Sequence, residues 1–168
     1  MAEVTLTTDH AAQRSLVRLR VWMGDIDRAG AALGLPTEPL TSRAGDPSVL
    51  WIGPDQWLYL SETVPAPQLI EQVDRILPNV IHVATDVSDA LACFLVEGPA
   101  ARALLAMASG VDFDETAFAA GRCVRTKFAR MAVVIHAAAP DRFELFLDRS
   151  GADYLEQWLR RAIKDATA

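Results

Sequence analysis

The stretch VLWIGPDQWLYL, residues 49–60, predicts two short strands joined by a turn at Gly-Pro-Asp. With Pro54 and Asp55 in the turn, the residues expected on one face are Leu50, Ile52, Trp57 and Tyr59, and those on the other are Val49, Trp51, Leu58 and Leu60. Neither face is polar, although a hairpin at a protein surface usually has one polar face. We expect one face to meet the helices of its own lobe, and the second to meet either the other lobe or another protein chain.

The elements around this hairpin alternate between strands and helices. In the first half, the expected elements are a strand over 15–21, a helix over 25–33, the hairpin, a helix over 69–77 and a strand over 80–87. In the second half, they are a strand over 90–98, a helix over 99–110, strands over 122–128, 131–138 and 142–148, and a final helix capped by Ser150. The final helix carries an apolar stripe of Tyr154, Leu155, Trp158, Leu159, Ala162 and Ile163.

This order predicts an α+β fold of two small antiparallel-sheet lobes with helices packed on them. The expected division is an N-terminal tail over 1–14, a first lobe over 15–88 and a second lobe over 89–168, together forming one compact unit. Residues 90–96 and 131–138 are apolar at alternate positions on both faces, as the hairpin is. This shared property suggests a central sheet that runs through both lobes.

Composition limits the function classes. Of the 168 residues, 51% are hydrophobic and 23% charged, as in ordinary globular proteins, and the net charge of -6 argues against a nucleic-acid surface. The first residues lack the basic start and apolar core of a signal peptide, and no apolar run approaches the ~18 residues of a membrane helix. We interpret Cys93 and Cys123 as buried thiols in a reducing compartment. We therefore expect a cytoplasmic protein without a membrane or nucleic-acid partner.

The sequence predicts no catalytic, cofactor-binding or metal-binding residue. His10 lies in the expected tail, while His82 and His136 lie in apolar strands with no carboxylate or nucleophile spaced to work with them. Ser88 has two nearby aspartates but no base, so a turn explains it. Gly98 opens a helix that in principle holds an anion, although helix initiation alone accounts for it. An active site within this chain is therefore not expected.

Two groups of residues are candidates for a partner interface. Trp51, Trp57 and Tyr59 qualify because aromatic residues are enriched at interface cores, although packing in the protein's own core explains them equally well. The basic residues Arg122, Arg125 and Lys127, followed by Arg130, form a stripe on an expected strand. The stripe fits a carboxylate-bearing ligand, an acidic partner surface or a solvated face with internal ion pairs.

Three stretches together resemble the gamma subunit of heterotetrameric sarcosine oxidase: LGLPTEPLTSRAGDPSVLWIGPDQWLYL, ATDVSDALACFLVEGPAARALLA and GRCVRTKFARMAVVIHAAAPDRFELFLDRSGADYLEQWL. The similarity runs from about Leu16 to Ile163. It implies a fold like the folate-binding domain of the glycine-cleavage aminomethyltransferase, and a non-catalytic assembly role in a complex that oxidatively demethylates sarcosine to glycine. It also implies alpha, beta and delta partner subunits, with alpha in direct contact. FAD, FMN, NAD and tetrahydrofolate are then bound by the partners, and this chain binds no cofactor.

Two alternatives to this role stay open. One is a free-standing tetrahydrofolate-binding one-carbon protein of the aminomethyltransferase type. The other is a gamma-like subunit of an N-methylglutamate dehydrogenase or another amine-oxidising complex. Aminomethyltransferases carry a Gly-Gly-Ile-Asp-Asp type segment, and the comparable stretch here, ARMAVVIHAAAP, has neither glycine pairs nor acids. This departure speaks against the first alternative.

Overall fold

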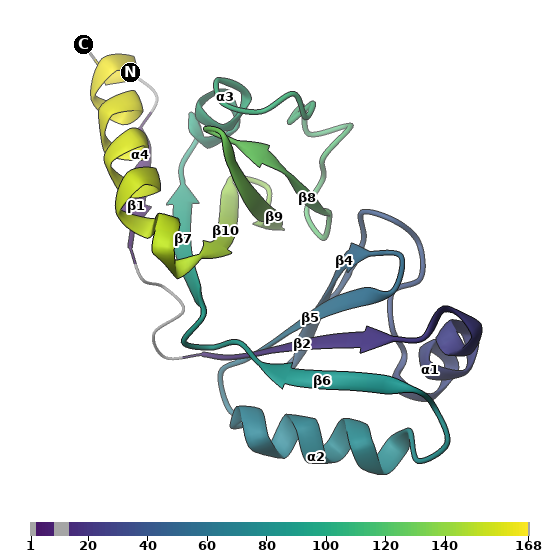
Figure 1. The fold of residues 1–168 in the computed structure, drawn as a ribbon. Coiled ribbons are helices and arrows are strands. Elements are labelled where there is room, and N and C mark those ends of the chain that lie inside the picture. The colour runs from purple at the N-terminus through teal and green to yellow at the C-terminus, as the bar shows by residue number, and fades with distance from the viewer. Residues whose placement is uncertain (1–2, 9–13, 168) are drawn as a thin grey trace. The chain divides into compact units, whose positions relative to one another are not determined.

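The computed structural model describes residues 3–8 and 14–167, which form two compact units. The N-terminal unit contains the described residues among 11–89, and the C-terminal unit joins those among 1–10 to those among 90–168. Each unit has a five-stranded antiparallel sheet with helices packed on one face (Figure 1). The predicted α+β fold with two antiparallel sheets is confirmed, but the sheets are separate, so the expectation of one central sheet is wrong.

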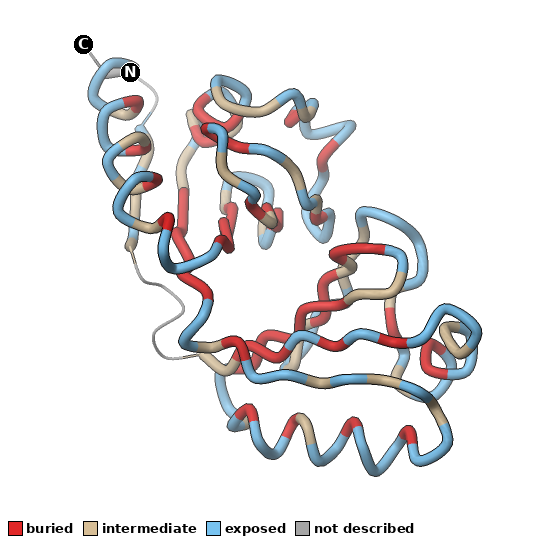
Figure 2. The backbone as a smooth tube through the Cα atoms, viewed as in Figure 1, coloured by how far each residue is buried: buried red, intermediate tan, exposed pale blue. Residues whose placement is uncertain are grey.

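In the N-terminal unit, two helices cover one face of the sheet. The strand order is β3 (Ser42–Arg43), β4 (Ser48–Gly53), β5 (Gln56–Ser61), β2 (Ser15–Val21), β6 (His82–Asp86). After the short helix η1 (Met23–Asp25), α1 (Ile26–Leu33) and α2 (Ala66–Ile76) lie against this sheet. The core between them includes Leu19 and Trp57 from the sheet and Leu69 and Val73 from α2. Figure 2 shows the buried positions of α2 on the side that faces the strands.

The β4–β5 hairpin has a different register from the one predicted. Val49 lies opposite Tyr59, Trp51 opposite Trp57 and Gly53 opposite Gln56, with an irregularity between Trp51 and Gly53. Ile52 is thus the extra residue of a β-bulge, which exchanges the two faces of β4 relative to β5. The helix side receives Val49, Trp51, Trp57 and Tyr59, and the opposite side Leu50, Ile52, Leu58 and Leu60. The predicted faces are wrong, whereas the prediction that neither is polar is confirmed. That the second face is covered by the other lobe or by another protein chain stays a prediction.

The C-terminal unit repeats the plan with its helices on one face. The strand order is β1 (Thr5–Thr7), β7 (Leu91–Glu97), β10 (Arg142–Asp148), β9 (Met131–Ala139), β8 (Cys123–Phe128). Two helices, α3 (Ala101–Ala106) and α4 (Ala152–Thr167), contribute to the core, and the short helix η2 (Arg149–Gly151) precedes α4. Both cysteines are buried thiols, as predicted.

This unit differs from the sequence prediction at both ends. Residues 5–7, placed in a tail over 1–14, form the edge strand β1, with Leu6 opposite Val96 of β7. Ser150 does not cap the last helix. Instead, the carboxylate of Asp148 accepts hydrogen bonds from the backbone N–H and the hydroxyl of Ser150. Asp148, two residues before Ser150, therefore caps the short helix η2 that leads into α4.

One arginine holds the long connection between α3 and β8. The Arg102 guanidinium donates to the carbonyl oxygens of Phe113 at 2.6 Å and Phe118 at 3.0 Å, and to that of Pro140 at 2.6 Å. It also lies 5.1 Å above the ring of Phe143. Because backbone carbonyls outside helices and strands need other donors, Arg102 fixes this connection against the β9–β10 turn.

Gly98 is required by the backbone that passes beside it. Its φ of +118° favours glycine, and a Cβ at this position would overlap the carbonyl oxygen of Glu3. We predict that Gly98→Ala lowers the free energy of unfolding by at least about 2 kcal/mol. Urea denaturation measures this change. Gly110→Ala is the matched control, because a Cβ there has no atom within 4 Å. Equal stability of both variants would contradict the assignment.

Candidate functional site

Both described histidines contact carboxylates, which the sequence analysis did not expect. His82 Nε2 lies 2.9 Å from Asp74 Oδ1 and its Nδ1 lies 2.9 Å from the carbonyl oxygen of Val80. His136 Nδ1 lies 3.0 Å from Glu144 Oε2, and this pair is buried. The expectation that no carboxylate is placed to work with them is wrong, because β9–β10 pairing puts His136 opposite Glu144 and α2 passes beside His82. His10 lies outside the described residues.

Ser88 serves a turn, as predicted. Its hydroxyl donates to Asp86 Oδ1 at 2.6 Å and accepts the backbone N–H of Leu16 at 2.9 Å. Within residues 3–8 and 14–167, no group of three or more His, Cys, Asp or Glu side chains gathers as a metal site would require. No helix in the same ranges has the length and apolar character needed to cross a membrane.

The three aromatic interface candidates lie in or beside the core of the N-terminal unit. Trp57 is fully buried, and its Nε1 donates to the carbonyl oxygen of Pro36 at 2.8 Å. Tyr59 is buried too, and burial raises its pKa to about 12. Trp51 is half-buried and packs against the same core. Trp57 and Tyr59 therefore have almost no surface to offer a partner, which favours the alternative of core packing.

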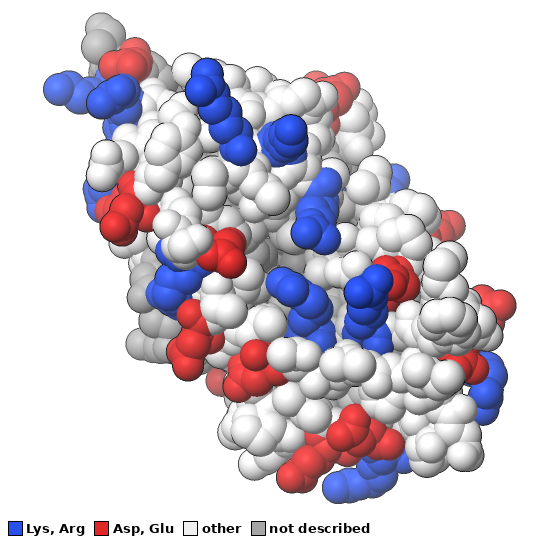
Figure 3. All heavy atoms as spheres, in the orientation of Figure 1, with Lys and Arg blue, Asp and Glu red and all other residues white. Residues whose placement is uncertain are grey.

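The basic interface candidates are exposed on the edge strand of the C-terminal unit. Arg125 and Lys127 project from one face of β8, opposite Val124 and Phe128, and Arg122 directly precedes the strand. In the part of the chain that the structure describes, their side chains form no ion pair. Over the face drawn in Figure 3, acidic and basic groups are interspersed with uncharged areas.

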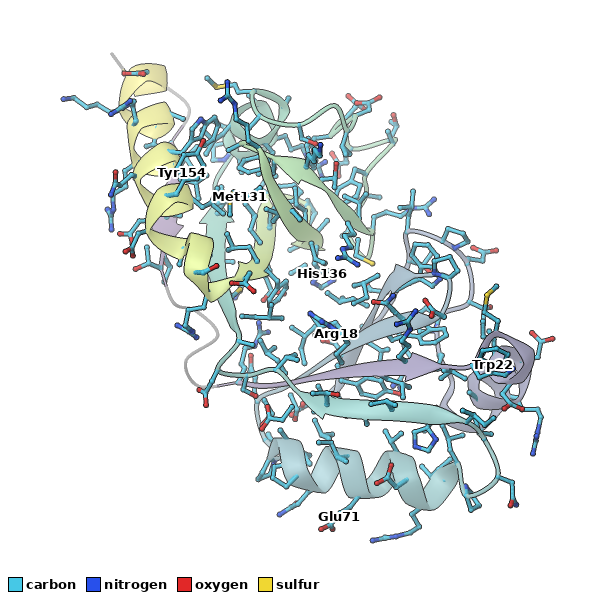
Figure 4. The ribbon with its side chains drawn as sticks, in the orientation of Figure 1. Arg18, Trp22, Glu71, Met131, His136 and Tyr154 are labelled. Atoms are coloured by element: carbon cyan, nitrogen blue, oxygen red, sulfur yellow. The ribbon has the colours of Figure 1, made fainter. Side chains whose placement is uncertain are left out.

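A cluster of exposed apolar side chains lies at one end of the N-terminal sheet, and we refer to it as the apolar surface. Its members and their exposed fractions are Trp22 63%, Met23 68%, Ile81 69% and Val83 62%. They line a depression of about 330 Å³ that Arg20 and Asp55 border. Figure 4 shows Trp22 beyond the end of β2, beside α1. Four large apolar side chains exposed together are unusual for a monomer and typical of a protein interaction site.

A charged pair closes the border of the apolar surface. Arg20 Nε donates to Asp55 Oδ2 at 2.7 Å, and this hydrogen bond holds the pKa of Asp55 below its usual range. A polar rim of this kind around an apolar centre is the ordinary arrangement of protein interfaces.

Sequence reasoning missed the apolar surface, although two signals mark it. Trp22 and Met23 follow Val21 directly, so the alternation of β2 ends in three consecutive large apolar residues. Ile81 directly precedes the edge strand β6 and Val83 lies on it, where a polar outer face is expected. Only the pairing of β6 with β2 places these two segments together.

Comparison with solved structures identifies the fold. The chain superposes on a chain of the heterotetrameric sarcosine oxidase from Corynebacterium sp. U-96 in complex with pyrrole 2-carboxylate, with a TM-score of 0.85, 24% identity and coverage of 98% of this chain and 86% of that chain. It also superposes on the glycine cleavage system aminomethyltransferase T from Bartonella henselae, with a TM-score of 0.67, 14% identity and coverage of 94% and 45%. The chain is thus an α+β protein with an aminomethyltransferase-like fold.

Sequence comparison then gives the family. The profile of the sarcosine oxidase, gamma subunit family matches residues 26–166, and the chain belongs to this family. It is 27% identical over 143 residues to sarcosine oxidase subunit gamma of Corynebacterium sp. (strain U-96), an alignment that covers 83% of this chain and 68% of that protein. The predicted resemblance is confirmed.

Substitution of Tyr59 tests whether its buried hydroxyl has a hydrogen-bond partner. Its buried hydroxyl has no hydrogen-bond partner among the described residues. Because an unpaired buried hydroxyl opposes folding, we predict that Tyr59→Phe leaves the free energy of unfolding unchanged or raises it by up to about 1.5 kcal/mol. Chemical denaturation measures this, with Trp57→Phe as a control that removes a used hydrogen bond and destabilises. A destabilised Tyr59→Phe would show that the hydroxyl has a partner.

Proposed function

We propose that the chain is the gamma-type subunit of a multi-subunit sarcosine oxidase, which converts sarcosine to glycine by oxidative demethylation. Membership of the gamma subunit family and the aminomethyltransferase-like fold support this role. In this proposal the chain contributes to assembly, while the alpha, beta and delta subunits carry the FAD, FMN, NAD and tetrahydrofolate. The cytoplasm is the proposed location.

The apolar surface is the observation that carries the assembly role. Trp22, Met23, Ile81 and Val83 are each more than 60% exposed, and burying such side chains against a partner stabilises a complex by about 1.5–3 kcal/mol each at full burial. The Arg20–Asp55 pair supplies a polar rim. We propose that the alpha subunit covers this surface, with an apolar patch of its own as the complement.

A folate-binding one-carbon protein is the second candidate, because the fold is that of an aminomethyltransferase. The segment of β9 and its flanks, ARMAVVIHAAAP, lacks the acids that serve folate chemistry in that family. Calorimetric titration of the isolated chain with tetrahydrofolate decides between the two. Micromolar binding would favour the one-carbon protein, whereas no heat of binding agrees with the assembly role. The neighbouring genes would distinguish a sarcosine oxidase from an N-methylglutamate dehydrogenase, because they would encode the large subunits of one or the other.

The double variant Trp22→Ser/Val83→Ser tests the apolar surface. We predict at least about tenfold less alpha subunit retained on the tagged chain after co-expression, since two apolar anchors are lost. The folded state is expected to persist because both side chains are exposed. Ile76→Ser on α2 is the matched control, as Ile76 is 47% exposed and lies outside the apolar surface. Equal retention by the double variant and the control would rule out this surface.

The basic stripe is tested by one charge reversal. We predict that Arg125→Glu weakens co-purification of the partner subunits and leaves the thermal unfolding midpoint unchanged, because Arg125 is exposed and forms no ion pair among the described residues. The effect should shrink as salt concentration rises. Full co-purification at low salt would remove the stripe from the interface.

A further inference from the structure

A pocket of about 490 Å³ in the C-terminal unit combines two cationic side chains with an aromatic wall. Lys127 and Arg130 supply the cations, and Tyr154 and Trp158 of α4 supply the wall. The residues after α3, from Met107 to Gly110, complete the lining. Figure 4 shows Tyr154 on α4, where it belongs to the predicted apolar stripe and is 48% exposed.

The two cations are available to a ligand. Neither Lys127 nor Arg130 forms an ion pair or side-chain hydrogen bond in the described ranges 3–8 and 14–167, although the chain carries a net charge of -6. An acidic protein offers many carboxylates that would neutralise two neighbouring cations. Leaving both unpaired in a concave site creates a local positive potential that attracts anions.

The backbone fixes Arg130 in an unfavourable conformation at this site. Ala129 and Arg130 form the two-residue loop between β8 and β9, with φ of +46° and +71°. Such loops favour Asn-Gly, because side chains with a Cβ are disfavoured at positive φ. Arginine at the glycine position is thus not explained by the turn, and retention of strain is typical of functional positions.

The pocket is held together by contacts between its three segments. The Ala129 N–H donates to the carbonyl oxygen of Ala108 at 3.0 Å, which joins the hairpin to the chain after α3. Phe128 meets Trp158 edge to face, with ring centroids 5.3 Å apart and an interplanar angle of 78°. These contacts orient the aromatic wall before a ligand arrives, so less ordering is needed on binding.

We propose that this pocket binds a small organic anion, with its phosphate or carboxylate group on Lys127 and Arg130 and a planar apolar part against Trp158 and Tyr154. Charge-assisted hydrogen bonds hold the anionic group, and the aromatic rings stack on the planar part. Lys127 and Arg130 also belong to the basic stripe, so the binding test uses the full chain alone, without partner subunits.

Calorimetry with phenyl phosphate tests the proposal, with inorganic phosphate and phenyl β-glucoside as probes that lack the ring or the charge. We expect one-to-one binding of phenyl phosphate, tighter than that of either comparison probe and weakened by salt. Arg130→Gly should reduce the affinity at least about tenfold while relaxing the turn, so misfolding does not explain the loss. Lys127→Ala should act in the same direction.

Arg125→Ala is the matched control, because it removes one cation from the same strand outside the pocket. It should bind phenyl phosphate as the unchanged chain does. The proposal would be overturned if the chain did not bind phenyl phosphate. It would also be overturned if Arg130→Gly bound phenyl phosphate with the same affinity as the unchanged chain. Binding of hexaglutamate but not phenyl phosphate would overturn it too, because the cations would then serve an acidic protein segment.

Discussion

The C-terminal unit depends on the hydrogen bonds of one guanidinium. The connection between α3 and β8 has no helix or strand of its own, so its carbonyl groups lack the partners that regular structure supplies. Arg102 meets this need for Phe113 and Phe118 and ties both to Pro140 in the β9–β10 turn. Its guanidinium also lies over the Phe143 ring. The segment that lines the pocket is thereby anchored at its far end, while the Ala108–Ala129 hydrogen bond anchors its near end.

Element order was predictable because apolar periodicity and turn residues report directly on local structure. The faces of the hairpin were not, because the bulge at Ile52 shifts the register between β4 and β5, and the apolar pattern of the sequence fits either register. The contact of His136 with Glu144 depends on a second irregularity. A turn at Pro140 and Asp141 alone would place Glu144 opposite Ala137, and the register shift between Arg142 and Phe143 brings it opposite His136. The role of Arg102 could not be predicted from the sequence, because its partners are backbone carbonyl groups, which every residue has.

The family and the basic stripe could be read from the sequence, whereas the apolar surface also required the pairing of β6 with β2. Combined motifs such as WIGPDQWL, DVSDA and GRCVRT carry the family resemblance, and the matched profile confirms it. Trp57 of the hairpin lies in the core, whereas Trp22, outside the hairpin, is exposed. Residue type alone does not separate the two, because core and interface favour the same aromatic residues. Strand pairing and side-chain exposure distinguish core from interface residues, and both are known only from the structure.

The proposed role of this chain is that of an assembly subunit in a flavin-containing complex. Purification of the tagged chain from its native host, with mass spectrometry of the retained proteins and an absorbance spectrum, tests this role. A yellow assembly that contains a large alpha-type subunit and two further subunits is the expected result. A colourless chain that elutes alone at the size of 168 residues would contradict it.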